Sequence, residues 1–152
     1  MKTYRGWHFV GKTLRDGRPV PKDGELLKFG GKPILCRQGL HFSLHPFDAL
    51  EYAPGKTLCM VECGGEVVMA KDKGVCTERT IIARMDADYL LREFARTQAL
   101  SVIHMAPEMD QVVYDYLITG DESIRTAASA AANAAELAAA SAAASAAANA
   151  AE

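Results

Sequence analysis

Residues 57–85 read TLCMVECGGEVVMAKDKGVCTERTIIARM, and this stretch decides the fold. Within it, residues 58–62, 66–69 and 79–85 are rich in β-branched and aliphatic side chains, which favours strands. Gly64-Gly65 separates the first two segments and is typical of a hairpin turn. The middle of the chain is therefore expected to be mostly β.

The residues before this stretch predict a first strand, a loop-rich segment and a short helix. Residues 4–10 alternate aromatic and polar side chains, as a strand does, and turn-forming residues follow between positions 16 and 24. A short strand is predicted at 39–43. A helix is predicted at 46–53, where proline at the first position loses no helical hydrogen bond and Pro54 ends the segment.

After Asp86 the spacing of apolar residues changes from that of strands to that of helices. One helix is predicted to be capped by Asp86 or Asp88, and a second to begin near Pro107 and end at Gly120. Both carry apolar stripes, so we expect them to dock on the sheet or on each other. The predicted fold is α+β, with a small twisted, mostly antiparallel sheet and peripheral helices over residues 1–120.

Residues 121–152 form an alanine-rich tail. Other residues interrupt the alanines at every fourth position from 129 to 149, and the octet SAAANAAE occurs at 129–136 and again at 145–152. Alanine has the highest helix propensity, so a helix about 45 Å long is expected. The tail is interpreted as a helical spacer without a partner. The alternative is self-association, because small side chains let helices approach closely.

The cysteines predict buried thiols and no metal site. The chain has four cysteines and no recognisable export signal, so reduced thiols are expected. Cys59 and Cys63 lie four residues apart in a predicted strand, a span of about 13 Å. Two thiolates on one zinc ion lie only about 4 Å apart. Structural thiols are therefore favoured over metal ligands.

The histidines are also interpreted as structural. His41 and His45 flank the boundary between a predicted strand and a predicted helix, so their side chains are expected to point in different directions. Trp7 and His8 are interpreted as packing residues of the first strand. No metal ligand set is expected among these positions.

Two motifs in the first half resemble a family of unknown function. Residues 35–43 read LCRQGLHFS, and residues 46–52 read PFDALEY. With Tyr4 and Gly6, they resemble a phage and prophage family that shares Tyr-x-Gly, Leu-Cys-x-x-Gly-(Leu/Phe)-His and Pro-x-Asp-(Ala/Val)-Leu-x-Tyr motifs, in some members with Ala/Ser-rich tails. The resemblance covers residues 4 to about 85. It implies a phage protein in the cytoplasm of a bacterial host cell.

A second, more distant resemblance suggests a reaction. The order Tyr4-Arg5-Gly6, then GLHFS at 39–43, then Tyr52 is similar to ADP-ribosyltransferases. In that family a His-Gly or Arg-Gly strand binds NAD, and a helix ending in Tyr lines one side of the nicotinamide site. The resemblance implies an ADP-ribosyltransferase-like fold with NAD as cofactor. The cofactor-binding residues that it implies are Tyr4, Arg5, Gly6, His41, Ser43 and Tyr52.

The same resemblance implies that Arg5 and Glu78 are catalytic. Arg5 is expected to pair with the phosphates or ribose of the dinucleotide, because guanidinium makes bidentate contacts to such oxyanions. Glu78 is expected to polarise the ribose 2′-hydroxyl and stabilise the cationic state as nicotinamide leaves. Tyr52 is expected to stack on the nicotinamide. His41 stands where the family has Tyr.

The expected function is that of a phage effector that transfers ADP-ribose from NAD to a host protein. Two alternatives stay open: a non-enzymatic phage inhibitor that binds a host defence complex of the CRISPR type, and a virion-associated structural protein, which the alanine array favours. The net charge of −2, with basic residues scattered along the chain, predicts no direct nucleic-acid partner. No membrane-spanning segment is expected.

Overall fold

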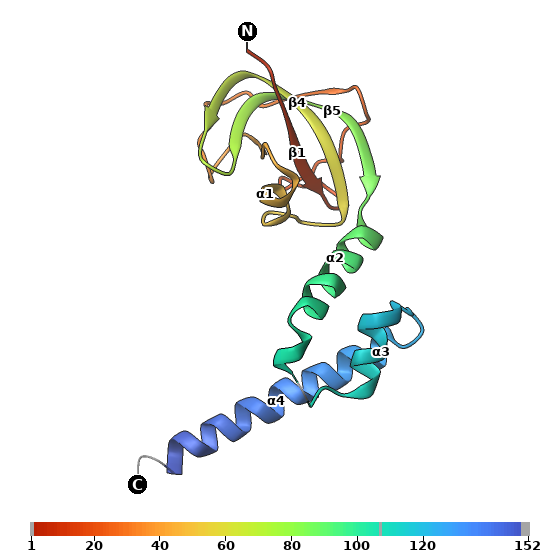
Figure 1. The fold of residues 1–152 in the computed structure, drawn as a ribbon. Coiled ribbons are helices and arrows are strands. Elements are labelled where there is room, and N and C mark those ends of the chain that lie inside the picture. The colour runs from red at the N-terminus through yellow and green to blue at the C-terminus, as the bar shows by residue number, and fades with distance from the viewer. Residues whose placement is uncertain (1, 107, 150–152) are drawn as a thin grey trace. The chain divides into compact units, whose positions relative to one another are not determined.

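The computed structural model describes residues 2–106 and 108–149 (Figure 1). They divide into two compact units, one that ends at Tyr89 and one that begins at Leu90. The predicted division into residues 1–120 and 121–152 stays a prediction.

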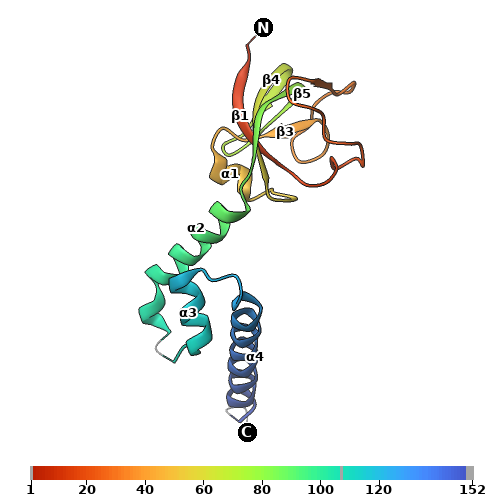
Figure 2. The same ribbon diagram turned by 90° about the vertical axis from the view of Figure 1, so that its right-hand side faces the viewer.

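The first unit is built on an open antiparallel sheet. Its strand order is β1-β4-β5-β2, and β3 also pairs with β5. A short helix, α1 (Pro46–Leu50), packs on β1, and Figure 2 shows both beside β3. The predicted α+β class with a mostly antiparallel sheet is confirmed. The strands are β1 (Tyr4–Val10), β2 (Leu26–Lys28), β3 (Leu40–Phe42), β4 (Thr57–Met69) and β5 (Gly74–Asp86).

The hairpin predicted at Gly64-Gly65 is wrong. Strand β4 runs through both glycines, and its pairing with β5 shifts between Gly64 and Val67, which marks a bulge. Gly65 adopts a positive φ of 70° there, a conformation that glycine adopts without strain. The Oγ1 of Thr77 accepts a hydrogen bond from the backbone N–H of Glu66 at 3.0 Å. The true turn follows β4, where the N–H of Ala70 donates to the carbonyl of Lys73 at 2.7 Å.

The helix predicted at 46–53 is shorter in the structure. Helix α1 ends at Leu50, and single turn hydrogen bonds then join Tyr52 to Ala49 and Ala53 to Leu50 before Pro54. The chain cannot stay helical into Pro54, because the residue before a proline is disfavoured in the α conformation.

The core lies between the sheet and the segments that cross it. Phe42, Val61 and Ile81 are at most 2% exposed. All four cysteines are free thiols, and Cys59, Cys63 and Cys76 are fully buried, as expected for structural thiols; Cys36 is exposed. Burial raises the pKa of the Cys59 thiol, so Cys59 packs as a neutral group.

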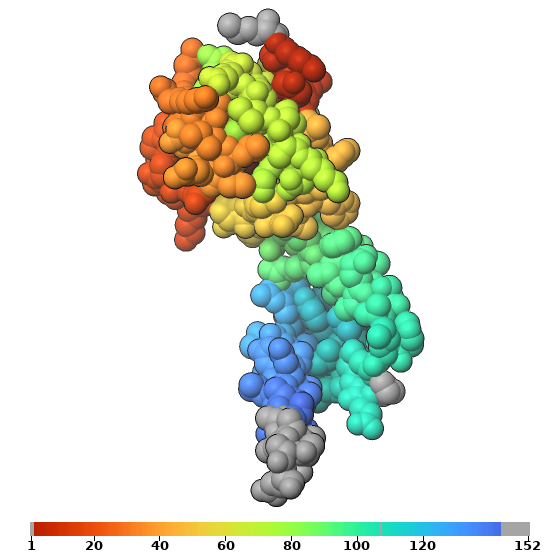
Figure 3. Space-filling model, turned by 90° about the vertical axis from the view of Figure 1, so that its left-hand side faces the viewer, coloured from red at the N-terminus to blue at the C-terminus, as the bar shows by residue number. Residues whose placement is uncertain are grey.

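The loop-rich segment between β1 and β3 is held to the sheet by backbone hydrogen bonds. The N–H of Gly24 donates to the carbonyl of Ile81 at 2.8 Å, and the N–H of Phe29 donates to the carbonyl of Thr77 at 2.8 Å. Figure 3 shows this segment, in red to orange, on one face of the unit beside the yellow-green part of the chain. Strand β5 therefore anchors loops as well as strands.

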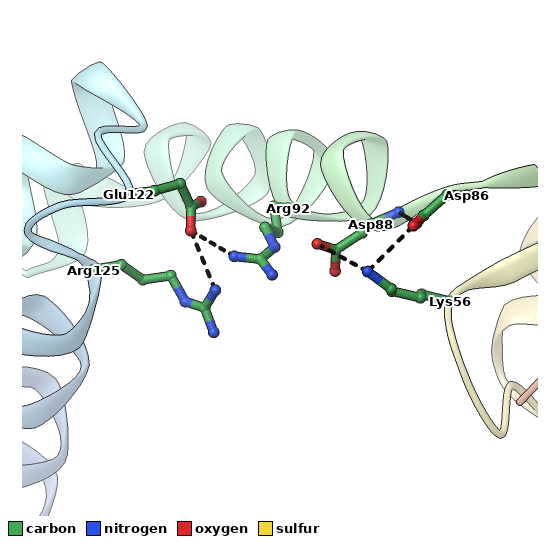
Figure 4. A network of polar contacts seen from close by, with 6 residues as sticks. All are labelled: Lys56, Asp86, Asp88, Arg92, Glu122 and Arg125. Atoms are coloured by element: carbon green, nitrogen blue, oxygen red, sulfur yellow. Dashed lines mark hydrogen bonds and ion pairs between the residues drawn. The ribbon is translucent and has the colours of Figure 1, made fainter. Parts of the chain in front are cut away.

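Helix α2 (Asp88–Ser101) begins two residues after Asp86, the first of the two predicted capping residues. The carboxylate of Asp86 accepts a hydrogen bond from the backbone N–H of Asp88 at 2.9 Å. Lys56 lies 3.2 Å from the Asp86 carboxylate and 3.6 Å from that of Asp88 (Figure 4). These contacts hold the end of β5 at the point where the helix starts.

The second unit is helical. After the turn of 3₁₀-helix Ile103–Met105, helix α3 (Gln111–Thr119) is capped by Asp110, whose side chain accepts from the N–H of Val112 at 2.9 Å. Gly120 ends α3, as predicted, and adopts the left-handed conformation. Helix α4 (Arg125–Asn149) is the predicted alanine-rich helix, and α3 packs against it.

A carboxylate links the elements of the helical unit. Glu122 accepts from Arg92 on α2 at 2.6 Å and from Arg125 at the start of α4 at 3.2 Å (Figure 4). Among the described residues, no helix has the length and apolar character needed to cross a membrane.

Candidate ligand-binding cleft

The first unit contains a cleft with a volume of about 860 Å³. It is lined by β1 and the loop after it, by β3 and the turn before it, and by parts of α1 and β5. Binding sites for small molecules commonly have volumes of roughly 300–1,000 Å³. The cleft is therefore large enough for a ligand of nucleotide size.

Arg79 is the buried charge of this cleft. It lies on β5 opposite Cys63, and the residue is 4% exposed. Its Nη1 donates a hydrogen bond to the backbone carbonyl of His41. No carboxylate among the described residues forms an ion pair with it. Burial lowers its pKa, and the nearby thiols of Cys63, Cys76 and Cys59 oppose that effect. A guanidinium stays charged in proteins, so the cleft contains a buried charge without a carboxylate partner among the described residues.

Further basic residues surround the cleft. The acid in the described lining is Asp16, which is already bound to Arg18 by hydrogen bonds of 2.9 and 2.7 Å. The cleft is thus cationic although the chain has a net charge of −2, and it suits an anion. The basic residues that line it besides Arg79 are Lys12, Arg15, Arg18, Arg37 and Lys73.

His41 holds the turn that precedes β3. The backbone N–H of Cys36 donates to its Nε2 at 3.1 Å. Because a backbone N–H can only donate, Nε2 is unprotonated, and the proton of this neutral imidazole is on Nδ1. Burial lowers the pKa of His41, and a hydrogen bond with the Gly39 backbone partly opposes that effect. His41 therefore has both ring nitrogens committed to the turn.

The turn needs this support because its backbone is unusual. Cys36 has a φ of +61° and Gly39 a φ of +110°. A Cβ at Gly39 would lie 2.5 Å from Cγ2 of Val75, so no other residue fits there. The Leu-Cys-x-x-Gly-Leu-His motif at 35–41 is thus explained by the geometry of the turn.

His8 differs from His41 because its imidazole has no hydrogen-bond partner among the described residues. It lies on β1 opposite Cys59 and lines the cleft. Burial, and then the charges of Arg79 and His41, hold its pKa well below the ordinary value. The interpretation of His8 as a packing residue missed this feature.

We expect acid to destabilise the unit through His8. Its pKa is lowered in the folded state, so below the ordinary value of 6.5 the unfolded chain binds more protons and the free energy of unfolding falls. This contribution is fully present above pH 6.5 and is lost as the pH falls below it, by at most about 2 kcal/mol at pH 5.

Urea unfolding at pH 7.5 and pH 5.0 measures this effect. His8→Gln should show a smaller loss between the two pH values than the wild type, and the exposed His45→Gln should match the wild type. An equal loss in His8→Gln and wild type would show that other groups cause the acid sensitivity.

Tyr52 lies at the rim of the cleft in a polar cluster. Its hydroxyl donates to the Asp72 carboxylate at 2.6 Å and accepts from Nζ of Lys73 at 2.8 Å. The hydrogen bond to Asp72 is the main cause of its raised pKa. Lys73 also lies 4.2 Å from the centre of the ring. One face of Tyr52 is therefore occupied, and at most the other can stack on a ligand.

The residues predicted from the transferase resemblance are brought together only in part. His41, Ser43 and Tyr52 line the cleft, whereas Tyr4, Arg5, Gly6 and Glu78 are not in its described lining. The predicted group of Arg5, Tyr52 and Glu78 is thus not assembled around this cleft. Whether the chain binds NAD or uses these residues in catalysis stays a prediction.

The four residues outside the cleft have other neighbours. Tyr4 packs near Phe42, with ring centres 6.3 Å apart, and a Cβ at Gly6 would lie 2.7 Å from the same ring. Arg5 is exposed between these two core residues and lies opposite Glu62 on β4. Glu78 forms an ion pair of 3.1 Å with Lys28.

The described residues contain no group of three or more His, Cys, Asp or Glu side chains that could hold a metal ion. The chemistry of the cleft is that of its cations, its imidazoles and its rim hydroxyl. These groups suit the binding of an anion.

The open antiparallel sheet and its cationic cleft define a small α+β domain with one ligand-sized site described in it. The chain belongs to the family called domain of unknown function (DUF7666), whose model matches residues 4–93. The predicted membership of a family of unknown function is confirmed. No curated protein and no solved structure matches the chain.

Proposed function

We propose that the first unit binds a phosphate-bearing organic anion of nucleotide size in the cleft. The observation that carries this proposal is Arg79, a buried guanidinium without a carboxylate partner among the described residues. A buried charge costs several kcal/mol unless it is paired. A ligand that supplies the missing negative charge accounts for an arginine at this position.

The surroundings of Arg79 support the same class of ligand. Arg15 and Lys73 add positive charge along the walls, and Trp7 adds an aromatic surface. Charge-assisted hydrogen bonds from guanidinium to phosphate are among the strongest in proteins. Aromatic surfaces bind bases by stacking, which contributes about 1–3 kcal/mol per base in nucleic-acid complexes. A nucleotide uses both features.

NAD belongs to this class and is the first dinucleotide to test. The resemblance to ADP-ribosyltransferases supports it, and a phage effector that modifies a host protein remains the corresponding enzyme hypothesis. Label transfer from NAD to proteins of a host lysate, lost in Arg5→Ala and Glu78→Gln, is the result that this hypothesis requires. NAD binding without transfer favours the non-enzymatic phage inhibitor instead.

Calorimetric titration with NAD, AMP and pyrophosphate tests the binding proposal. We expect at least one of these anions to bind, and Arg79→Met to weaken its binding by about 10- to 100-fold, because a hydrogen bond to a charged group contributes about 1.5–3 kcal/mol.

Arg84→Met is the matched control. Arg84 lies on the same strand but outside the cleft lining, and it binds Asp23 and the carbonyl of Pro21. Both variants remove one positive charge, so a difference in anion binding between them reports on the position of Arg79 in the cleft and not on net charge. The proposal fails if none of the three anions binds, or if Arg79→Met and Arg84→Met weaken binding equally.

A further inference from the structure

We infer that His8 and Arg79 together form the subsite for the phosphate group, that the preferred ligand carries a phosphate monoester, and that its binding places a proton on His8. This inference rests on the proposed binding of a phosphate-bearing anion in the cleft. It assigns a second residue to that site and narrows the class of ligand.

His8 is the imidazole of the cleft that has free hydrogen-bonding capacity. His41 uses Nε2 to accept from the backbone N–H of Cys36 at 3.1 Å, so it cannot gain a proton there without breaking the turn. His8 has no hydrogen-bond partner among the described residues, and it lines the same cleft as Arg79. The side chain of His8 is only partly buried, and no described side-chain nitrogen or oxygen is both buried and without a partner. The ring nitrogens of His8 are therefore accessible to a ligand oxygen.

The charges that face His8 explain why the proton is absent from the empty cleft. The positive charge of Arg79 on β5 and, less strongly, the imidazole of His41 on β3 disfavour a proton on His8. Its neighbour on β4 is Cys59, a neutral thiol, and the described lining takes only the apolar Ala49 from helix α1. These surroundings contain no negative charge that could stabilise an imidazolium.

A bound anion makes protonation of His8 favourable. Phosphate oxygens beside His8 attract a proton to the ring, and the protonated ring then donates a hydrogen bond to the ligand. No covalent bond forms or breaks, because the proton comes from solvent and returns to it on release.

The same charges distinguish between kinds of phosphate. A phosphate monoester carries close to two negative charges on one phosphorus at neutral pH, because its second pKa is about 6. Arg79 balances one of them and protonated His8 balances the other. The pyrophosphate of NAD carries a single charge on each phosphorus, so each of its phosphate groups interacts less strongly with Arg79 and protonated His8 together. AMP should therefore bind more tightly than NAD.

Calorimetry of AMP binding at pH 7.5, in two buffers that differ in enthalpy of ionisation, counts the protons taken up. We expect the wild type to take up about half to one proton per AMP. His8→Gln should still bind AMP, about 10-fold more weakly, without proton uptake. The exposed His45→Gln, which is outside the described lining, should match the wild type in both respects.

The outcomes separate this inference from the proposed function. If AMP binds without proton uptake, if His8→Gln takes up as many protons as the wild type, or if NAD binds more tightly than AMP, the inference is wrong while the cleft remains an anion site. If AMP, NAD and pyrophosphate all fail to bind the wild type, the proposed function is wrong and the inference with it.

Discussion

Arg79→Met should make the protein more stable while it weakens anion binding. We expect the free energy of unfolding without ligand to rise by about 1–2 kcal/mol. Replacing buried charged groups by apolar residues of similar size is often neutral or stabilising by about 1–4 kcal/mol. Methionine is flexible enough to fill the space left among the buried thiols near Arg79.

One lost contact opposes this gain. Arg79 donates to the backbone carbonyl of His41 and so joins β5 to β3. An unsatisfied buried acceptor costs about 1–3 kcal/mol, but this carbonyl lies at the cleft, where water can replace the guanidinium. The desolvation of a whole charge costs several kcal/mol and is the larger effect. The free energy of unfolding of Arg79→Met should therefore exceed that of the wild type.

Urea unfolding of the wild type, Arg79→Met and Arg84→Met measures this difference. Arg84→Met should be up to about 1 kcal/mol less stable than the wild type, because it loses exposed contacts to Asp23 and Pro21. If the free energy of unfolding rises in Arg79→Met and falls in Arg84→Met, Arg79 contributes to binding at the expense of stability. If Arg79→Met is instead less stable than Arg84→Met, Arg79 mainly holds β3 and β5 together.

The elements of the sheet could be predicted from the sequence where one physical rule decides them. Residues 4–10 alternate in character, and β1 has those bounds. The glycines at 64 and 65 could not be interpreted in this way, because glycine serves a hairpin turn and a bulge equally well. Only the pairing of β4 with β5, and Thr77 in reach of the bulge, decides between the two.

The cationic cleft could not be predicted because its residues are far apart in the chain. Basic residues that appear scattered in the sequence, such as Lys12, Arg37 and Lys73, come together only when β3 and the loops are in place. One local signal was available. Arg79 opens the predicted strand 79–85 and stands two residues before Ile81, so the alternation of a strand puts a charge on the same face as an apolar residue.

The resemblance to ADP-ribosyltransferases compared residues in chain order, and order does not determine which face of a strand a side chain occupies. Side chains of neighbouring strand residues point to opposite faces. Tyr4 and Gly6 point toward Phe42 in the core, so Arg5 between them points to the other face. Arg5 lies there opposite Glu62, and the described lining of the cleft takes only residues 7–10 from β1.

Phe42→Ala should cause the largest loss of stability in the first unit, about 3–5 kcal/mol in the free energy of unfolding. Phe42 is 2% exposed and lies between two glycines. A Cβ at Gly6 would lie 2.7 Å from its ring, and one at Gly74 would lie 2.6 Å from it. Strands β1 and β5 thus approach the ring closely, and the two glycines have no side chains that could fill the cavity that alanine would leave.

Phe47→Ala is the matched control, because the side chain of Phe47 in α1 is 66% exposed. Its loss should stay below about 1 kcal/mol. Urea unfolding of both variants measures the difference, and small domains have only about 5–15 kcal/mol of stability, so Phe42→Ala should also unfold at clearly lower temperature. Similar losses in the two variants would mean that β1 and β5 close onto each other when the ring is removed, and that the two glycines do not set the spacing of the strands.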